Sequence, residues 1–217
     1  MNAGSTVTTR LLLVRHAQTA LSMNDAFCGV TDAPLAPIGH RQAQALADRL
    51  RNRHVDALYS SPQRRALETA APLAAALGQE IRTLEALREM DFGLWENRPR
   101  AELLREYPEL LSAWDRGLWM GNPPGGETRQ GVIARVIPCV IELLNNHPGQ
   151  TILIVSHRTT LRLLTGHMLD MALSSSRRMQ VSPTSLTELH VRGDQVEILF
   201  YNDTSHLASL EEPHSPG

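Results

Sequence analysis

Two short apolar runs each lead into a histidine, and this pattern constrains the fold more than any other feature of the chain. The run at 11–14 reaches His16 after one polar residue, and the run at 151–155 reaches His157 in the same way. Such runs are typical of strands buried on both faces of a parallel sheet. In open α/β sheets the ligand crevice lies beyond the carboxyl ends of the strands. We therefore expect His16 and His157 to meet at one rim, in a catalytic site.

The order of the remaining segments favours the same architecture. Apolar spacing and turn residues predict short strands at 55–59 and 80–84, a hairpin at 184–191 and 195–201, and helices around 43–50, 61–77, 132–144 and 161–168. Ser61 is the expected N-cap of its helix, with Pro62 at the first helical position. This alternation predicts an α/β protein, a three-layer α/β/α sandwich with a mostly parallel sheet.

Length and composition suit a single catalytic domain. The 217 residues fit one domain over 1–217, and a net charge of −2 gives no reason to expect nucleic acid as a partner. Two cysteines, Cys28 and Cys139, are too few for a disulfide framework or a four-cysteine zinc site, so we expect no metal. No stretch approaches the ~18 apolar residues of a membrane span, and residues 1–9 hold no apolar leader, which favours a cytoplasmic location.

The pattern changes between residues 97 and 127, where we expect a lid or insertion. Two short helical pieces, around 101–106 and 109–118, precede a Pro/Gly-rich stretch. Three aromatic residues here suit either core packing or a pocket wall, and core packing is the default: Tyr107, Trp114 and Trp119. Residues 208–217 read as a loose tail.

Arg15-His16 suits attack on phosphorus. A neutral imidazole is a good nucleophile, and a guanidinium beside it binds phosphate oxygens in pairs. Taken alone, the dipeptide is equally compatible with a structural histidine and a surface arginine. Arg65, in the first turn of a helix after a strand, can reach the same rim, whereas Arg64 is better explained by a solvated face.

A proton donor and a second charged group complete the candidate set. Glu89 can protonate a leaving alkoxide and then activate water, although Glu85, Asp91 and Glu96 compete with it for this role. His157 can stabilise charge on the transferring phosphoryl group. A Ser156–His157 hydrolase dyad is a poor alternative, because adjacent strand residues point in opposite directions.

These elements, in this order, resemble the histidine phosphatase superfamily, also called the phosphoglycerate mutase-like family. The matching segments are Arg-His-Ala-Gln-Thr at 15–19, Gly-x-x-Asp-x-Pro-Leu at 29–35, Ser-Pro-x-x-Arg-Ala-x-x-Thr-Ala at 61–70, Leu-x-Glu-x-x-Phe-Gly-x-Trp-Glu at 87–96, Gly-Gly-Glu at 125–127, Val-Ser-His at 155–157 and Asn-Asp-Thr-x-His-Leu at 202–207. The resemblance covers about residues 10–207. It implies the phosphoglycerate mutase-like fold.

The resemblance also implies a mechanism without a metal or other cofactor. In that mechanism His16 attacks phosphorus, Arg15, Arg65 and His157 hold the phosphoryl oxygens, and Glu89 exchanges the proton. We also expect four residues on the substrate and phosphate side of the site: Ser22, Cys28, Gly29 and Arg158.

Four positions depart from the family pattern. Ala17 replaces a glycine beside the nucleophile, which is tolerable unless that residue needs a positive φ. Ser22 stands where many members have asparagine, and Asn97 and Arg158 each replace a glycine. Arg158 either adds positive charge for a second anionic group of the substrate or points into solvent.

Three functions compete at this point. The favoured one is a phosphomonoesterase acting on a small phosphorylated metabolite such as a sugar phosphate, a phosphoglycerate derivative, phosphoserine or a nucleotide-loop phosphate. A cofactor-dependent phosphoglycerate mutase is the alternative, but residues 98–126 lack the Arg-Arg-Ser-Tyr-Asp-type segment of the longer mutase pattern. A non-catalytic phospho-ligand or partner-binding member is the third. The final hairpin suggests an exposed sheet edge and a possible homodimer.

Overall fold

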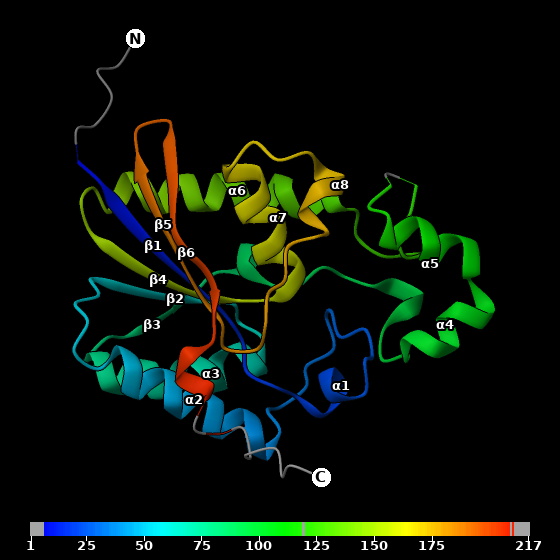
Figure 1. Ribbon diagram of the computed structural model, residues 1–217, viewed down its shortest axis with the longest axis horizontal. Helices are drawn as coiled ribbons and strands as arrows, with labels where there is room; N and C mark the ends of the chain where they lie inside the picture. The colour runs from blue at the N-terminus through cyan, green and yellow to red at the C-terminus, as the bar shows by residue number, and fades with distance from the viewer. Residues whose placement is uncertain (1–6, 119, 209, 211–217) are drawn as a thin grey trace.

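A single mixed sheet organises the protein. The computed structural model describes residues 7–118, 120–208 and 210, and within them six strands lie in the order β3-β2-β4-β1-β5-β6 (Figure 1). Strands β1 to β4 run parallel, whereas β5 is antiparallel to β1 and β6 to β5. The strands are β1 (Thr9–Arg15), β2 (Ala57–Ser60), β3 (Ile81–Thr83), β4 (Thr151–Ser156), β5 (Leu186–Arg192) and β6 (Gln195–Asp203). The predicted mostly parallel sheet is confirmed.

Helices cover both faces of this sheet (Figure 1). The helices are α1 (Ala20–Met23), α2 (Pro37–Leu50), α3 (Arg64–Leu77), α4 (Arg100–Glu106), α5 (Pro108–Asp115), α6 (Arg129–Asn146), α7 (Arg158–Met168) and α8 (Leu173–Ser176). The apolar stripes of α2 and α3 pack on one face, and those of α6 and α7 pack on the other. The protein is therefore the three-layer sandwich that the sequence predicts.

The continuous apolar runs of β1 and β4 follow from this layering. In β1, Leu11 and Leu13 face the α6–α7 layer, while Leu12 and Val14 face the α2–α3 layer. Successive side chains of a strand point to opposite faces, so a strand covered on both sides needs apolar residues throughout. Both strands are buried at the centre of the sheet, and their carboxyl ends point to the same rim.

One helix boundary differs from the prediction. Helix α3 begins at Arg64 after the extended residue Gln63, so Ser61 is not its N-cap and Pro62 is not its first residue. The Oγ of Ser61 instead accepts a hydrogen bond from the backbone N–H of Gln63 and contacts His157 at 2.8 Å.

The segment from 97 to 127 packs on a small apolar cluster that it shares with residues 90–95 and with helices α6 and α7. Helices α4 and α5 lie beside one end of the sandwich rather than over the sheet (Figure 1). The buried indole of Trp114 joins this cluster with Trp95 and Phe92, and Tyr107 packs against it at the margin. Trp114 is therefore a core residue, as expected, and it also lines a cavity, so both roles weighed for these aromatics hold at this residue. Trp119 lies outside the described residues.

Strand β6 forms one edge of the sheet and exposes Ile198 and Leu199. The homodimer that this edge suggests stays a prediction. Of the predicted tail at 208–217, only residues 208 and 210 belong to the described part. No helix within the described residues is long and apolar enough to cross a membrane.

Candidate active site

The two histidines that end the apolar runs lie together at the carboxyl rim of the sheet. Arg15 at the end of β1 is paired in register with Ser156 at the end of β4, so the next residue of each strand emerges side by side. The ring centroids of His16 and His157 are 5.1 Å apart. The sequence expectation that these histidines meet is confirmed.

His16 is held as a neutral ring with a defined tautomer. Its Nδ1 lies 2.7 Å from the carbonyl oxygen of Ala17, which can only accept, so Nδ1 carries the proton and Nε2 carries the lone pair. Burial, reinforced by the positive charges of Arg65 and Arg15, holds the pKa of His16 well below its ordinary value of 6.5. His16 therefore keeps a nucleophilic nitrogen at neutral pH.

His157 lies behind His16, with both nitrogens engaged by the protein. Its Nδ1 accepts a hydrogen bond from Nε of Arg65 at 3.2 Å, and its Nε2 donates to Oγ of Ser61 at 2.8 Å. The side chain is fully buried, and burial together with Arg65 holds its pKa well below 6.5. His157 is thus neutral and fixed in orientation.

Arg65 ties the same region to the loop that follows the nucleophile. The guanidinium is fully buried, and it donates to the carbonyl oxygens of Thr31 and Gly29 at 2.7 Å each and to that of Cys28 at 3.3 Å. The sequence places Arg65 on the sheet side of its helix, and the burial agrees. Arg64, predicted to be solvated, is exposed and pairs with Glu68.

Glu89 is anchored at the first turn of α7. Its Oε1 accepts from the backbone N–H groups of Met90 at 2.8 Å and Thr160 at 3.2 Å, and its Oε2 accepts from that of Thr159 at 3.0 Å. The first N–H groups of a helix have no partner within the helix, and this carboxylate satisfies two of them. Oε2 has one backbone partner and Oε1 has two, so Oε2 is the oxygen with more freedom to exchange a proton.

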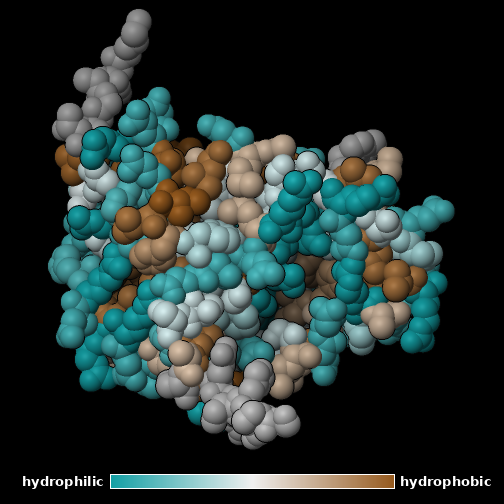
Figure 2. All heavy atoms as spheres, in the orientation of Figure 1, coloured by the Kyte–Doolittle hydropathy of each residue, from teal (hydrophilic) through white to brown (hydrophobic). Residues whose placement is uncertain are grey.

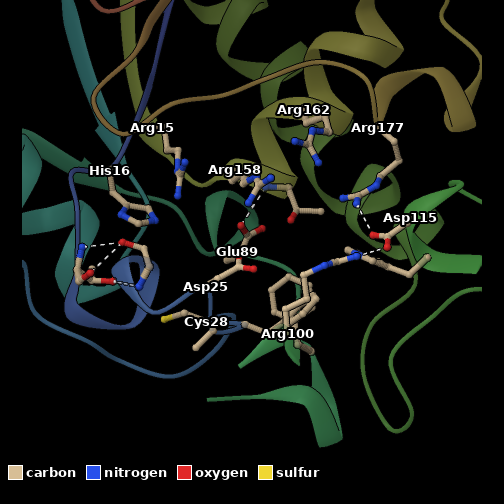
Figure 3. Close-up of a pocket in the computed structure, with 17 residues that line it drawn as sticks. Arg15, His16, Asp25, Cys28, Glu89, Arg100, Asp115, Arg158, Arg162 and Arg177 are labelled. Atoms are coloured by element: carbon tan, nitrogen blue, oxygen red, sulfur yellow. Dashed lines mark hydrogen bonds and ion pairs between the residues drawn. The ribbon is translucent and has the colours of Figure 1, made fainter. Parts of the chain in front are cut away.

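A cavity of about 350 Å³ opens at this rim (Figure 3). Six of the residues named from the sequence line it: Arg15, His16, Ser22, Cys28, Glu89 and Arg158. Arg65, His157 and Gly29 do not line it. The N–H of Gly29 is bonded to the Glu96 carboxylate and its carbonyl to Arg65, so Gly29 shapes the loop rather than the cavity wall.

The lining of the cavity also distinguishes Glu89 from the three carboxylates that the sequence offers as alternative proton donors. None of the three lines the cavity. The Glu96 side chain organises a loop by accepting from the backbone N–H groups of Val30 and Phe92. Asp91 accepts from the N–H of Gly93 in a tight turn. Of these four acids, Glu89 alone lines the cavity that holds His16.

Arg15 presents part of its guanidinium without a protein partner. One terminal nitrogen donates to the carbonyl oxygen of Val181 at 2.7 Å, whereas the buried Nε has no hydrogen-bond partner within the described residues. Burial, followed by the repulsion of Arg158, lowers the pKa of Arg15 to about 9. An anion bound in the cavity would offset both the burial of the Arg15 charge and its repulsion by Arg158.

Sequence reasoning missed five charged residues of the cavity wall. They are Asp25, Arg100, Asp115, Arg162 and Arg177. Arg162 was detectable, because it stands one helical turn after Arg158 on a predicted helix that begins at the rim. The others come from loops and from α4, α5 and the end of α8, whose placement no local pattern predicts.

The departures from the family pattern are accommodated locally. Ala17 is buried, donates its N–H to Thr69 Oγ1, and does not have a positive φ, so its methyl group is tolerated. Asn97 adopts a φ of +61°, the conformation that favours the glycine it replaces. Within the part of the chain that the structure describes, no three histidine, cysteine or carboxylate side chains gather as metal ligands.

The comparisons with known proteins agree with this geometry. A family model described as the histidine phosphatase superfamily (branch 1) matches residues 11–204. The chain is a histidine phosphatase of this superfamily.

Relatives of this histidine phosphatase include enzymes named for two reactions. It is 31% identical over 201 residues to phosphoserine phosphatase 1 of Hydrogenobacter thermophilus, covering 93% of this chain and 95% of the relative. It is 32% identical over 163 residues to a 2,3-bisphosphoglycerate-dependent phosphoglycerate mutase of Cytophaga hutchinsonii, covering 73% and 76%. The structure of a mycobacterial glucosyl-3-phosphoglycerate phosphatase superposes with a TM-score of 0.83 at 27% identity, covering 90% of this chain and 99% of that one.

Proposed function

We propose that this histidine phosphatase hydrolyses a small phosphorylated metabolite through a phosphohistidine formed on His16. One observation carries the proposal. The neutral His16 shares its cavity with the Glu89 carboxyl and with Arg15, whose buried Nε has no hydrogen-bond partner within the described residues. These three are the nucleophile, the proton carrier and the phosphate ligand that phosphoryl transfer needs.

In the first step Nε2 of His16 attacks phosphorus in line with the ester oxygen. The N–P bond forms as the P–O bond breaks, and the leaving alkoxide takes a proton from the Glu89 carboxyl. Oε2 is the favoured proton carrier, because Oε1 already accepts from two backbone N–H groups. Arg15 neutralises charge on the phosphoryl oxygens.

In the second step water attacks the phosphohistidine. Glu89, now a carboxylate, takes a proton from the water as the new P–O bond forms and the P–N bond breaks. Inorganic phosphate leaves, and His16 returns to its neutral form with Nδ1 still bonded to Ala17. The same carboxyl serves as acid and then as base, so no second acid is needed.

Arg65 supplies positive charge behind His16, and the neutral His157 supplies a hydrogen-bond donor. The Nε2–H of His157 is donated to Ser61, so direct contact with a phosphoryl oxygen requires that this bond be exchanged. The Arg65 guanidinium donates four of its five N–H groups to protein atoms. With this exchange they are the further phosphoryl ligands, beside Arg15.

The phosphatase is favoured over the mutase by the cavity wall. Residues 98–126 form α4, α5 and a Pro/Gly-rich loop, and they lack the Arg-Arg-Ser-Tyr-Asp-type segment of the longer mutase pattern. The relatives named phosphoserine phosphatase and glucosyl-3-phosphoglycerate phosphatase support the same choice. The similarity to a phosphoglycerate mutase supports a second candidate function, in which the phosphoryl group is transferred from His16 back to the substrate instead of to water.

Phosphate release from a panel of phosphomonoesters, measured in EDTA for wild type and His16→Ala, tests the proposal. We expect wild type to release phosphate and His16→Ala to lose roughly 10⁴-fold or more of that rate. Interconversion of 3- and 2-phosphoglycerate primed by 2,3-bisphosphoglycerate, without phosphate release, would establish the mutase instead. Binding of substrates without either reaction would contradict both.

A further inference from the structure

The cavity extends well beyond His16, Arg15 and Glu89 toward a wall of arginines. We name this group the distal arginine cluster: Arg100, Arg158, Arg162 and Arg177. Figure 3 shows Arg15, Arg158, Arg162 and Arg177 in a row across one side of the cavity, with Arg100 and Asp115 at the far end. The cluster comes from α4, from the first two turns of α7 and from the residue after α8.

The positive charge of this wall is only partly balanced by the protein. Asp115 forms ion pairs with both Arg100 and Arg177. Arg158 and Arg162 form no ion pair with a carboxylate anywhere in the described ranges. Besides Asp115, the carboxylates that line the cavity are Asp25 and Glu89, and Glu89 is already engaged by α7. The middle of the row therefore carries unpaired positive charge.

Arg162 is the best-built member of the cluster. Its side chain is 4% exposed, and its Nε donates to the carbonyl oxygen of Met179 at 2.9 Å, which holds the guanidinium in place at the cavity wall. Burial and the repulsion of Arg158 and Arg177 lower its pKa to about 10. Burying an unpaired cation is costly, so such a group indicates a missing anionic partner.

Arg177 is fixed in a similar way at the end of the row. Its guanidinium lies over the ring of Trp114, 5.0 Å from the centroid, and its buried Nε has no hydrogen-bond partner within the described residues. Burial lowers its pKa as well. Two arginines are thus held rigidly at the outer end of the cavity, and rigid guanidinium groups lose little entropy on binding a carboxylate or phosphate.

We propose that the distal arginine cluster binds a second anionic group, carried by the alcohol part of the substrate. This inference rests on the proposed function, which places the scissile phosphate at His16 and Arg15. The substrates are then phosphomonoesters that bear a carboxylate or a further phosphate several bonds away from the ester. Arg162 and Arg158 are the expected ligands of that group, with Arg177 behind them.

Pairs of substrates that differ only in the second anion test this proposal. O-phosphoserine and O-phosphoethanolamine differ by one carboxylate, and fructose 1,6-bisphosphate and fructose 6-phosphate differ by one phosphate. We expect kcat/KM to favour the more anionic member of at least one pair by about tenfold or more, as expected for charge-assisted hydrogen bonds. The pair with the larger ratio identifies the chemistry of the second anion.

Variants of the cluster then locate the effect. Arg158→Ala removes an exposed side chain, and Arg162→Gln keeps an amide that can still donate to Met179. We expect each to lower the ratio within the preferred pair several-fold. Arg178→Ala, an exposed neighbour outside the cavity wall, is the matched control and leaves the ratio unchanged. Thermal melting checks that each variant is folded.

The outcomes separate this inference from the proposed function. Phosphate release with equal kcat/KM within both pairs, or an equal loss on both members in the variants, overturns the second-anion site alone. No release from any compound overturns the proposed function. In that case calorimetric binding of the same pairs to His16→Ala decides the inference, because preferential binding of the more anionic member supports it and equal binding overturns it.

Discussion

The inner and outer halves of the cavity are built in opposite ways. In the inner half, His16 and His157 follow adjacent strands. Nδ1 of His16, both ring nitrogens of His157 and the Arg65 guanidinium bind protein atoms, and Nε2 of His16 keeps its lone pair. In the outer half, Arg158 and Arg162 have no ion pair within the described residues. The inner half is preorganised for one reaction, while the outer half leaves its charges for a ligand to satisfy. The two halves should therefore respond differently to substitution.

Glu89→Gln gives the largest expected effect after loss of the nucleophile. Without a proton donor, hydrolysis of alkyl phosphates should fall by about 10²–10⁴-fold. p-Nitrophenyl phosphate has a leaving group that needs little protonation, so its rate of phosphohistidine formation should fall far less. Single-turnover rates on both substrates check this. An equal loss on both would show that Glu89 acts by anchoring α7 rather than by donating a proton.

The buried histidines of the inner half predict a pH dependence of stability. His16 and His157 have pKa values well below 6.5 in the folded protein, so the unfolded chain binds protons that the folded one refuses. The contribution of these two histidines to the free energy of unfolding is complete above about pH 6.5 and is lost as the pH falls below that value. Each should cost about 1.4 kcal/mol of unfolding free energy per pH unit.

Urea unfolding between pH 7 and pH 5 measures this slope. The carboxylates with lowered pKa values begin to act only near their ordinary values of 3.8 to 4.5; they are Asp56, Glu68, Glu106 and Asp203. His16→Asn should flatten the slope. An unchanged slope in His16→Asn would contradict the lowered pKa.

Ser61→Ala tests how tightly the inner half is tied together. The substitution leaves the buried Nε2–H of His157 without its acceptor, and we expect a loss of about 1–3 kcal/mol in the free energy of unfolding. Denaturant unfolding gives the value. A stability equal to that of wild type would mean that His157 finds another partner at no cost.

Substitution of Asn97, the first residue of the segment 97–127, gives the smallest expected change in stability. Because its φ is +61°, Asn97→Gly should change stability by less than about 1 kcal/mol, whereas Asn97→Ala should lose about 1–2 kcal/mol. Thermal melts of both variants provide the comparison. Equal melting temperatures would show that the backbone here relaxes out of the left-handed region.

The two halves were also unequally predictable from the sequence. The apolar runs of β1 and β4 predict the sheet, because a central parallel strand is covered on both faces and needs consecutive apolar residues. The ends of these runs also show in the sequence, so the pattern places His16 and His157 together at one rim. Glu89 follows a short turn, and only the family resemblance separates it from its neighbours. The structure then places Glu89 in the cavity.

The charged residues of the outer half could not be predicted from the sequence, because tertiary packing brings them together from separate elements. Arg100 and Asp115 lie 15 residues apart and meet through the folding of α4 against α5. Arg177 follows α8, and its contacts in the cavity wall are with Trp114 and Asp115 of α5, more than 60 residues earlier in the chain. The predicted start of α3 at Ser61 is wrong, and the Oγ of Ser61 bonds instead to the distant His157, a contact that no local pattern predicts.

The position of β1 in the sheet also decides when the enzyme can first work. Both strands that pair with β1, namely β4 and β5, begin at residue 151 or later. During synthesis the first strand to leave the ribosome therefore waits for most of the chain before it finds a neighbour, and contacts this distant in sequence form slowly. The strand that leads into His16 holds four consecutive apolar residues, Leu11 to Val14, and these stay without their neighbouring strands until the last third of the chain emerges.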